Sequence, residues 1–136
     1  MKDVTAMIVG TTKETNGRNN TMGLDMYLYE LTKVNQWRKA NQIHCWFVRN
    51  IQDNNDDCDF YLIKKADIQK LYKTIEEVLE DNKLAKELLP VMDGFNFGSR
   101  EYDEYYFAEL KRTQCMLKDF LDNWDDKHIY VYQSEW

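Results

Sequence analysis

The spacing of apolar residues changes along the chain, and the changes predict strands and helices in alternation. Apolar and polar side chains alternate over residues 24–33 and 129–133, as expected for strands with one buried face. Residues 4–9 and 60–64 are short runs rich in β-branched, aromatic or other apolar side chains, and they also favour strands.

Three longer stretches repeat apolar residues at every third or fourth position, the period of a helix with one buried face. They are residues 36–51, 68–81 and 100–127. Asn35, Asp67 and Ser99 precede them as predicted N-caps, and a short helical segment over residues 83–89 ends at Pro90. The order β-α-β-α-α-β predicts an α+β fold, with a small sheet of three or four strands and about three helices packed mainly on one face.

The beginning of the chain differs from the rest. Residues 11–21 are rich in asparagine and threonine and have almost nothing to bury. We therefore expect residues 1–21 to be a flexible or accessory extension, and residues 22–136 to form a single α+β domain. A chain of 136 residues with 43% apolar residues can bury one core.

The charge is uneven. Residues 1–65 hold nine basic and eight acidic groups, whereas residues 66–136 hold nine basic and sixteen acidic ones, and the formal net charge is −6. This balance disfavours direct nucleic-acid binding, which needs cations against phosphates. Two interpretations of the acidic helices stay open, a solvated face and a mimic of a phosphate backbone. The acidic rows are Glu76, Glu77, Glu80 and Asp81, and Asp119, Asp122, Asp125 and Asp126.

Several other classes of site lack their sequence signals. The three cysteines have neither the even number nor the CxxC spacing of a disulfide framework or zinc site, so we expect reduced thiols. Asp53, Asn55 and Asp57 alternate as in a calcium loop, but the sixth-position glycine and final glutamate are missing. We expect no metal and no cofactor. The chain has no apolar run of membrane-spanning length and no secretory signal, which predicts a cytoplasmic protein.

Polar and aromatic residues that could line a binding site occur in three segments of the chain. They are Arg38, Asn41, His44, Ser99, Tyr102, Asp103, Gln133, Ser134 and Trp136. Arg38 beside a helix beginning at Ser99 would suit a phosphate, and aromatic faces would suit a base. The alternative is a polar network between helix and sheet in which these groups satisfy one another, with His44 a hydrogen-bonded core histidine.

A catalytic interpretation would use His44 with Asp57 or Asp103 as base and orienting acid, and Cys58 or Ser99 as nucleophile. No GxSxG turn supports it. We therefore expect binding, and keep a small hydrolase or nucleotide-modifying enzyme as the alternative. Aromatic residues make up 14% of the chain, more than one small core readily absorbs, which predicts self-association as a homodimer.

Five stretches together resemble a family of small uncharacterised proteins encoded by bacteriophages and prophages. They are MGLDMYLYE (22–30), WRKANQIHCWFV (37–48), DDC (56–58), LLPVMDGFNFGSREYDEYYF (88–107) and YQSEW (132–136). Because small accessory phage proteins often bind host components, the resemblance implies a non-enzymatic inhibitor of a host defence. Such a protein would sequester a nucleotide-like small molecule or block a host protein in the host cytoplasm.

Overall fold

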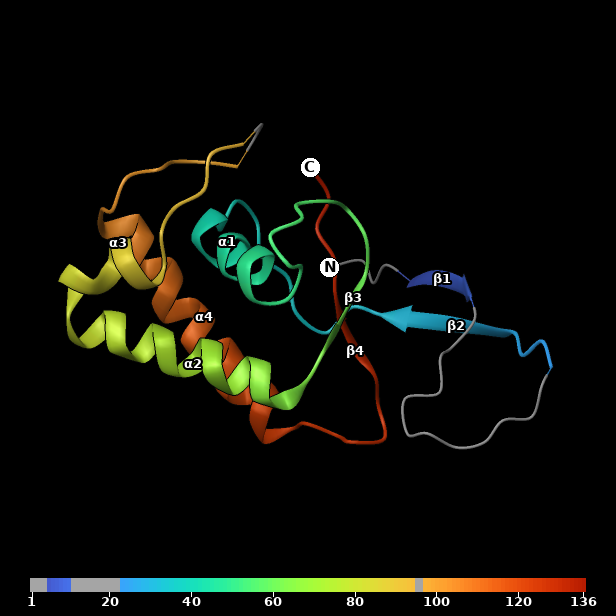
Figure 1. Ribbon diagram of the computed structural model, residues 1–136. Helices are drawn as coiled ribbons and strands as arrows, with labels where there is room; N and C mark the ends of the chain where they lie inside the picture. The colour runs from blue at the N-terminus through green and yellow to red at the C-terminus, as the bar shows by residue number, and fades with distance from the viewer. Residues whose placement is uncertain (1–4, 11–22, 95–96) are drawn as a thin grey trace. The chain divides into compact units, whose positions relative to one another are not determined.

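The structure is a computed structural model that describes residues 5–10, 23–94 and 97–136 (Figure 1). The chain divides into two compact units, Met1–Gln36 and Trp37–Trp136. The elements are β1 (Thr5–Gly10), β2 (Tyr27–Thr32), α1 (Asn41–Asn50), β3 (Tyr61–Ile63), α2 (Lys65–Glu80), the 3₁₀ turn η1 (Asn82–Leu84), α3 (Ala85–Leu88), α4 (Glu104–Asp122) and β4 (Tyr130–Tyr132). The predicted α+β class is confirmed.

The strands of the described residues form two antiparallel pairs, and not the single sheet that we expected. In the first unit β1 pairs with β2, and Thr5 lies opposite Thr32. In the second unit β3 pairs with β4, and Leu62 lies opposite Val131. The predicted strands are therefore present, but β2 is paired with a strand from the first ten residues and does not join β3 and β4.

The boundary between the units differs from the predicted domain boundary at residue 22, because it falls between Gln36 and Trp37. Strand β2, expected as the first strand of the domain, belongs to the first unit with β1. The polar run over residues 11–21 lies outside the described residues. The accessory role of residues 1–21 stays a prediction.

The core of the second unit is built from α1, α2 and α4. Helices α2 and α4 pack side by side and run in opposite directions (Figure 1). The residues predicted to be buried on α2 and α4 by their helical spacing include Ile68, Leu71, Ile75, Val78, Tyr106, Leu110, Thr113 and Leu117, and all of these are buried. The β3–β4 pair contributes Ile63, Tyr130 and Tyr132 to this core, which agrees with helices on one face of the strands.

Helix α1 begins at Asn41 and not at residue 36. Lys39 has a φ of 58°, in the left-handed region, which interrupts the helical path. Gly98 approaches this turn closely, with a φ of +92°; a Cβ there would lie 3.0 Å from the Lys39 Cβ and 3.1 Å from its carbonyl oxygen. Trp37 therefore precedes the helix, and its indole Nε1 donates to Thr113 Oγ1 at 3.0 Å. The predicted cap at Asn35 is wrong.

Helix α4 begins after Asp103, and Ser99 is not its N-cap. The Asp103 carboxylate accepts hydrogen bonds from the backbone N–H groups of Tyr105 and Tyr106, both at 3.1 Å. Asp67, the predicted cap of α2, occupies the third position of this helix, three residues after the observed N-cap Lys64. Its carboxylate accepts from the backbone N–H of Lys64 at 2.9 Å, which stabilises the same helix end.

Candidate functional site

His44 lies at the centre of a polar cluster that joins α1, the loop over residues 52–59 and the end of the chain. Its Nδ1 lies 2.6 Å from the Tyr132 hydroxyl, and its Nε2 lies 2.8 Å from Asp56 Oδ1. The Trp136 indole Nε1 donates to the same Asp56 oxygen at 3.2 Å. We call His44, Asp56, Tyr132 and Trp136 the His44 cluster.

The partners of His44 fix its tautomer. An ionised carboxylate can only accept hydrogen bonds, so in the neutral imidazole Nε2 carries the proton that faces Asp56 and Nδ1 accepts from Tyr132. Burial, and secondarily the charge of Asp56, raises the pKa of the Tyr132 phenol, which keeps its proton available for donation. Both ring nitrogens of His44 are therefore bonded within the protein.

Aromatic packing holds the cluster in place. The Tyr132 ring stacks on Phe47 with centroids 3.9 Å apart and 6° between the planes. Phe97 meets His44 edge to face at 5.4 Å, and the His44 side chain is only 11% exposed. On the same helix, burial raises the pKa of the Cys45 thiol. The imidazole of His44 therefore lies at the packed edge of the core, with little of its surface open to a solute.

The C-terminal residues are tied to the loop beside the cluster. Gln133 Nε2 donates to the Cys58 carbonyl at 3.1 Å, and Ser134 Oγ lies 3.4 Å from the Asp57 carbonyl oxygen. The Asp57 carboxylate accepts from the Tyr61 hydroxyl at 2.7 Å and from the Asn55 amide at 2.7 Å. The loop and the C-terminus therefore hold each other through hydrogen bonds.

Asn41 ties α1 to the segment before α4. Its amide Nδ2 donates to the carbonyls of Phe97 and Ser99, at 3.0 and 2.8 Å, and its Oδ1 accepts from the backbone N–H of Met92 at 3.0 Å. The residue is 3% exposed. Every hydrogen-bonding position of this buried amide except one is thus occupied by backbone, which identifies Asn41 as a structural residue.

The structure brings together only some of the predicted site residues. His44, Gln133, Ser134 and Trp136 meet around the loop, and Asn41 meets Ser99 through its carbonyl. The remaining three are elsewhere: Tyr102 accepts from the backbone of Val91, Asp103 caps α4, and Arg38 is exposed and bonds to no described residue. The predicted phosphate site of Arg38 beside a helix end at Ser99 is not formed, because α4 starts five residues later.

The arrangement that the catalytic alternative requires, with Asp57 or Asp103 as the partner of His44, is not assembled in the described residues either. Asp56, and neither Asp57 nor Asp103, is the acidic partner of His44. Sequence reasoning missed Asp56 and Tyr132. The sequence does contain adjacent acids at 56 and 57, but which of the two faces the helix depends on the path of the loop.

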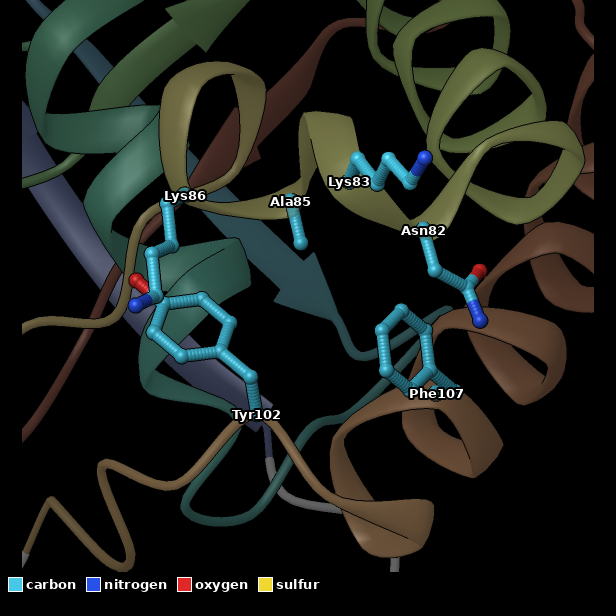
Figure 2. A pocket seen from close by; sticks show the side chains of 6 residues that line it. All are labelled: Asn82, Lys83, Ala85, Lys86, Tyr102 and Phe107. Carbon is cyan, nitrogen blue, oxygen red and sulfur yellow. The ribbon is translucent and has the colours of Figure 1, made fainter.

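A second polar and aromatic region lies where η1 and α3 meet the beginning of α4 (Figure 2). It is an open hollow of about 450 Å³. Its lining residues are Asn82, Lys83, Ala85, Lys86, Tyr102 and Phe107. The Lys86 ammonium lies 5.7 Å from the centroid of the Tyr102 ring. We call this region the α3–α4 hollow; Tyr102 is the one predicted site residue in it.

The acidic rows lie at different ends of the α2–α4 pair. Residues 76–81 occupy the end of α2, which leads into η1 and the hollow, whereas Asp119 and Asp122 occupy the end of α4. Because the two helices run in opposite directions, the C-terminal ends of α2 and α4 lie at opposite ends of the helix pair (Figure 1). The rows do not form one continuous acidic surface.

No protein-family model, curated protein or solved structure matches the chain. The resemblance to phage-encoded proteins stays a prediction. None of the helices in the described residues has the length and apolar character needed to cross a membrane. Within residues 5–10, 23–94 and 97–136, no group of three or more His, Cys, Asp or Glu side chains is placed to hold a metal ion.

Proposed function

We propose that this protein works by binding, as a phage-encoded accessory protein that inhibits a host defence and turns over no substrate. The supporting observation is the closure of the His44 cluster. A histidine general base takes a proton from the substrate or from a nucleophile held against it, so one of its nitrogens must face one of these groups. In this protein Asp56 occupies Nε2 of His44, and Nδ1 faces the Tyr132 hydroxyl, whose ring stacks on Phe47 and whose pKa is raised by burial, which makes it a poor nucleophile.

The bound component is either a nucleotide-like small molecule or a host protein. The α3–α4 hollow favours the small molecule, because it combines exposed lysines with aromatic side chains. The nucleic-acid mimic receives less support, since its two acidic rows lie at different ends of the helix pair. The hydrolase alternative also receives less support, because both nitrogens of His44 face Asp56 and the buried Tyr132 hydroxyl.

Self-association also stays a proposal. Of the aromatic residues on which it was based, Tyr106 is buried and Tyr102 is half-buried, whereas Tyr105 and Trp136 are 75% and 57% exposed. The core therefore buries some of the aromatic side chains on which the dimer prediction was based. Light scattering at micromolar concentration decides the question, because a mass near 16.4 kDa would mean a monomer.

The central test is phage plating on bacteria that each carry one defined defence system and express this protein. Expression should restore plating on at least one of these strains and change nothing on the strain without a defence. The destabilised variant Asn41→Ala, expressed from the same plasmid, is the negative control. Unchanged plating on every defended strain would contradict the proposal.

A turnover assay separates binding from catalysis. The purified protein is incubated with a panel of nucleotides, and products are followed by mass spectrometry. We expect no product. Turnover that disappears in both Asp56→Asn and Tyr132→Phe, with the folded state verified by circular dichroism, would instead establish the hydrolase alternative.

A further inference from the structure

We propose that the α3–α4 hollow is a binding site for a planar ring that carries a phosphate group, the chemistry of a nucleoside monophosphate. This inference rests on the proposed binding function, and it adds the location of the site and the class of its ligand.

The aromatic side of the hollow is held in position before any ligand arrives. The Tyr102 ring packs against Tyr106 with centroids 5.0 Å apart, and Tyr106 packs against Phe107 at 4.8 Å. The Tyr102 hydroxyl accepts a hydrogen bond from the Val91 backbone at 3.0 Å, so this ring cannot turn freely. Because the Lys86 ammonium lies over the Tyr102 ring, a ligand ring would stack on Phe107, which Tyr106 already holds in place.

The shape of the hollow suits a molecule of this size. Its volume of about 450 Å³ lies in the range of roughly 300 to 1,000 Å³ that is usual for small-molecule sites. Ala85, which is 2% exposed, contributes only a methyl group to the floor. In Figure 2, Tyr102 and Lys86 lie on one side of Ala85, and Phe107 and Asn82 lie on the other.

The lysines supply the charge for a phosphate. Lys83 and Lys86 are exposed, and neither ammonium forms an ion pair with a described residue. Glu87 follows Lys86 in the chain but does not pair with it. Two ammonium groups without an ion-pair partner among the described residues thus stand beside aromatic rings, next to the acidic end of α2 in a protein with a formal net charge of −6.

The presence of both lysines and aromatic rings limits the class of ligand that fits the hollow. A neutral apolar molecule would leave the lysines without a counter-ion, and a free phosphate would leave the aromatic rings without a partner. A phosphorylated ring uses both, because the base stacks on an aromatic face while the phosphate meets an ammonium. Asn82 adds an amide that can read the polar edge of the ring.

Calorimetric titration of the full chain with three probes tests this proposal. The probes are adenosine monophosphate, adenosine and inorganic phosphate. Adenosine monophosphate should bind more tightly than either part alone. Each of Lys83→Gln and Lys86→Gln should weaken its binding by about threefold to tenfold. Phe107→Leu, which keeps apolar volume but removes the π face, should weaken it by about fivefold or more.

Lys65→Gln is the matched control, because it removes the same charge from the first residue of α2, at the opposite end of that helix from the hollow. It should retain the affinity of the wild type. The affinity of adenosine should be nearly unchanged in the lysine variants, since adenosine carries no phosphate.

The results distinguish this inference from the proposed function. If adenosine monophosphate does not bind, or binds equally well to the lysine double variant, the hollow is not this site. Inhibition of a host defence that persists in the double variant would leave the binding function in place without the hollow. Catalytic turnover, or a lack of effect on every defence, would remove the proposed function itself.

Discussion

The His44 cluster and the α3–α4 hollow both combine polar groups with aromatic rings, yet they use their polar groups in opposite ways. In the cluster, the imidazole, the phenol and the indole all bond to protein atoms. In the hollow, the ammonium groups of Lys83 and Lys86 have no ionic partner among the described residues. Polar residues that are equally plausible as ligand contacts in the sequence therefore differ in the structure, because only some of them can still form an ionic contact to a ligand.

Burial explains the difference. A polar atom removed from water must find a partner or lose about 1 to 3 kcal/mol, whereas an exposed ammonium stays solvated until a ligand replaces the water. In the part of the chain that the structure describes, every buried side-chain nitrogen and oxygen has a hydrogen-bond partner. Substitutions near α1 should thus affect stability, and substitutions in the hollow should affect binding.

The largest effect is expected for Asn41→Ala. The substitution removes three hydrogen bonds and leaves the Phe97 and Ser99 carbonyls and the Met92 N–H without their partner. We expect a loss of about 2 to 4 kcal/mol in the free energy of unfolding, measured by urea denaturation.

Asn50→Ala is the control for this substitution on the same helix, because Asn50 is exposed; its amide donates to the Trp46 carbonyl and accepts only from the exposed Lys70 ammonium. It should cost less than about 1 kcal/mol. Equal losses in the two variants would mean that Asn41 does not anchor the segment before α4.

Tyr132→Phe should have the next largest effect. It removes the donor to His44 Nδ1 and keeps the ring that stacks on Phe47, so we expect a loss of about 1 to 2 kcal/mol at pH 7. Urea denaturation gives the value. A loss below the error of the measurement would show that the closed cluster adds no stability.

Tyr132→Phe should also change how the free energy of unfolding depends on pH in alkaline solution. Burial raises the folded-state pKa of Tyr132 and of Tyr106 above the value of about 10 in the unfolded chain. The unfolded chain therefore ionises first, and stability that is fully present below pH 10 should fall above it, by up to about 1.4 kcal/mol per pH unit for each tyrosine. Tyr132→Phe should make this decline shallower, and the exposed Tyr105 gives the control Tyr105→Phe.

Trp136→Ala should have a smaller effect. The side chain is 57% exposed, donates to Asp56 at 3.2 Å, and meets Phe97 edge to face at 6.5 Å. We expect a loss of about 0.5 to 1 kcal/mol, because Asp56 keeps His44 as a partner and can bind water in place of the indole. Thermal unfolding gives the comparison, and a loss as large as that of Asn41→Ala would contradict it.

The smallest effect on stability is expected in the hollow. The double variant of Lys83→Gln and Lys86→Gln should change the free energy of unfolding by less than about 0.5 kcal/mol, because both side chains are exposed and neither forms an ion pair in the described residues. Urea denaturation checks this value. A large loss would mean that the lysines have a structural role, which would weaken the contrast with the His44 cluster.

The sequence by itself determined the class of fold and most of the helical core. The period of apolar residues gave α2 and α4 with their buried faces, because a helix that packs on one side must repeat such residues every three or four positions. It also gave the strands at both ends of the chain and the loop after α1. These features depend on neighbours in the chain, which a pattern records.

Only the tertiary structure decided where the helices begin and which polar groups meet. Ser99 and Asp103 are both good caps, and the choice of Asp103 follows from the bonds that Asn41 makes to the residues before it. Likewise, Asp56 and Asp57 are adjacent in sequence, but only Asp56 faces His44, 12 residues away. The hollow brings residues 82–86 against residues 102–107, and such contacts depend on how α2 packs on α4, which no local pattern contains.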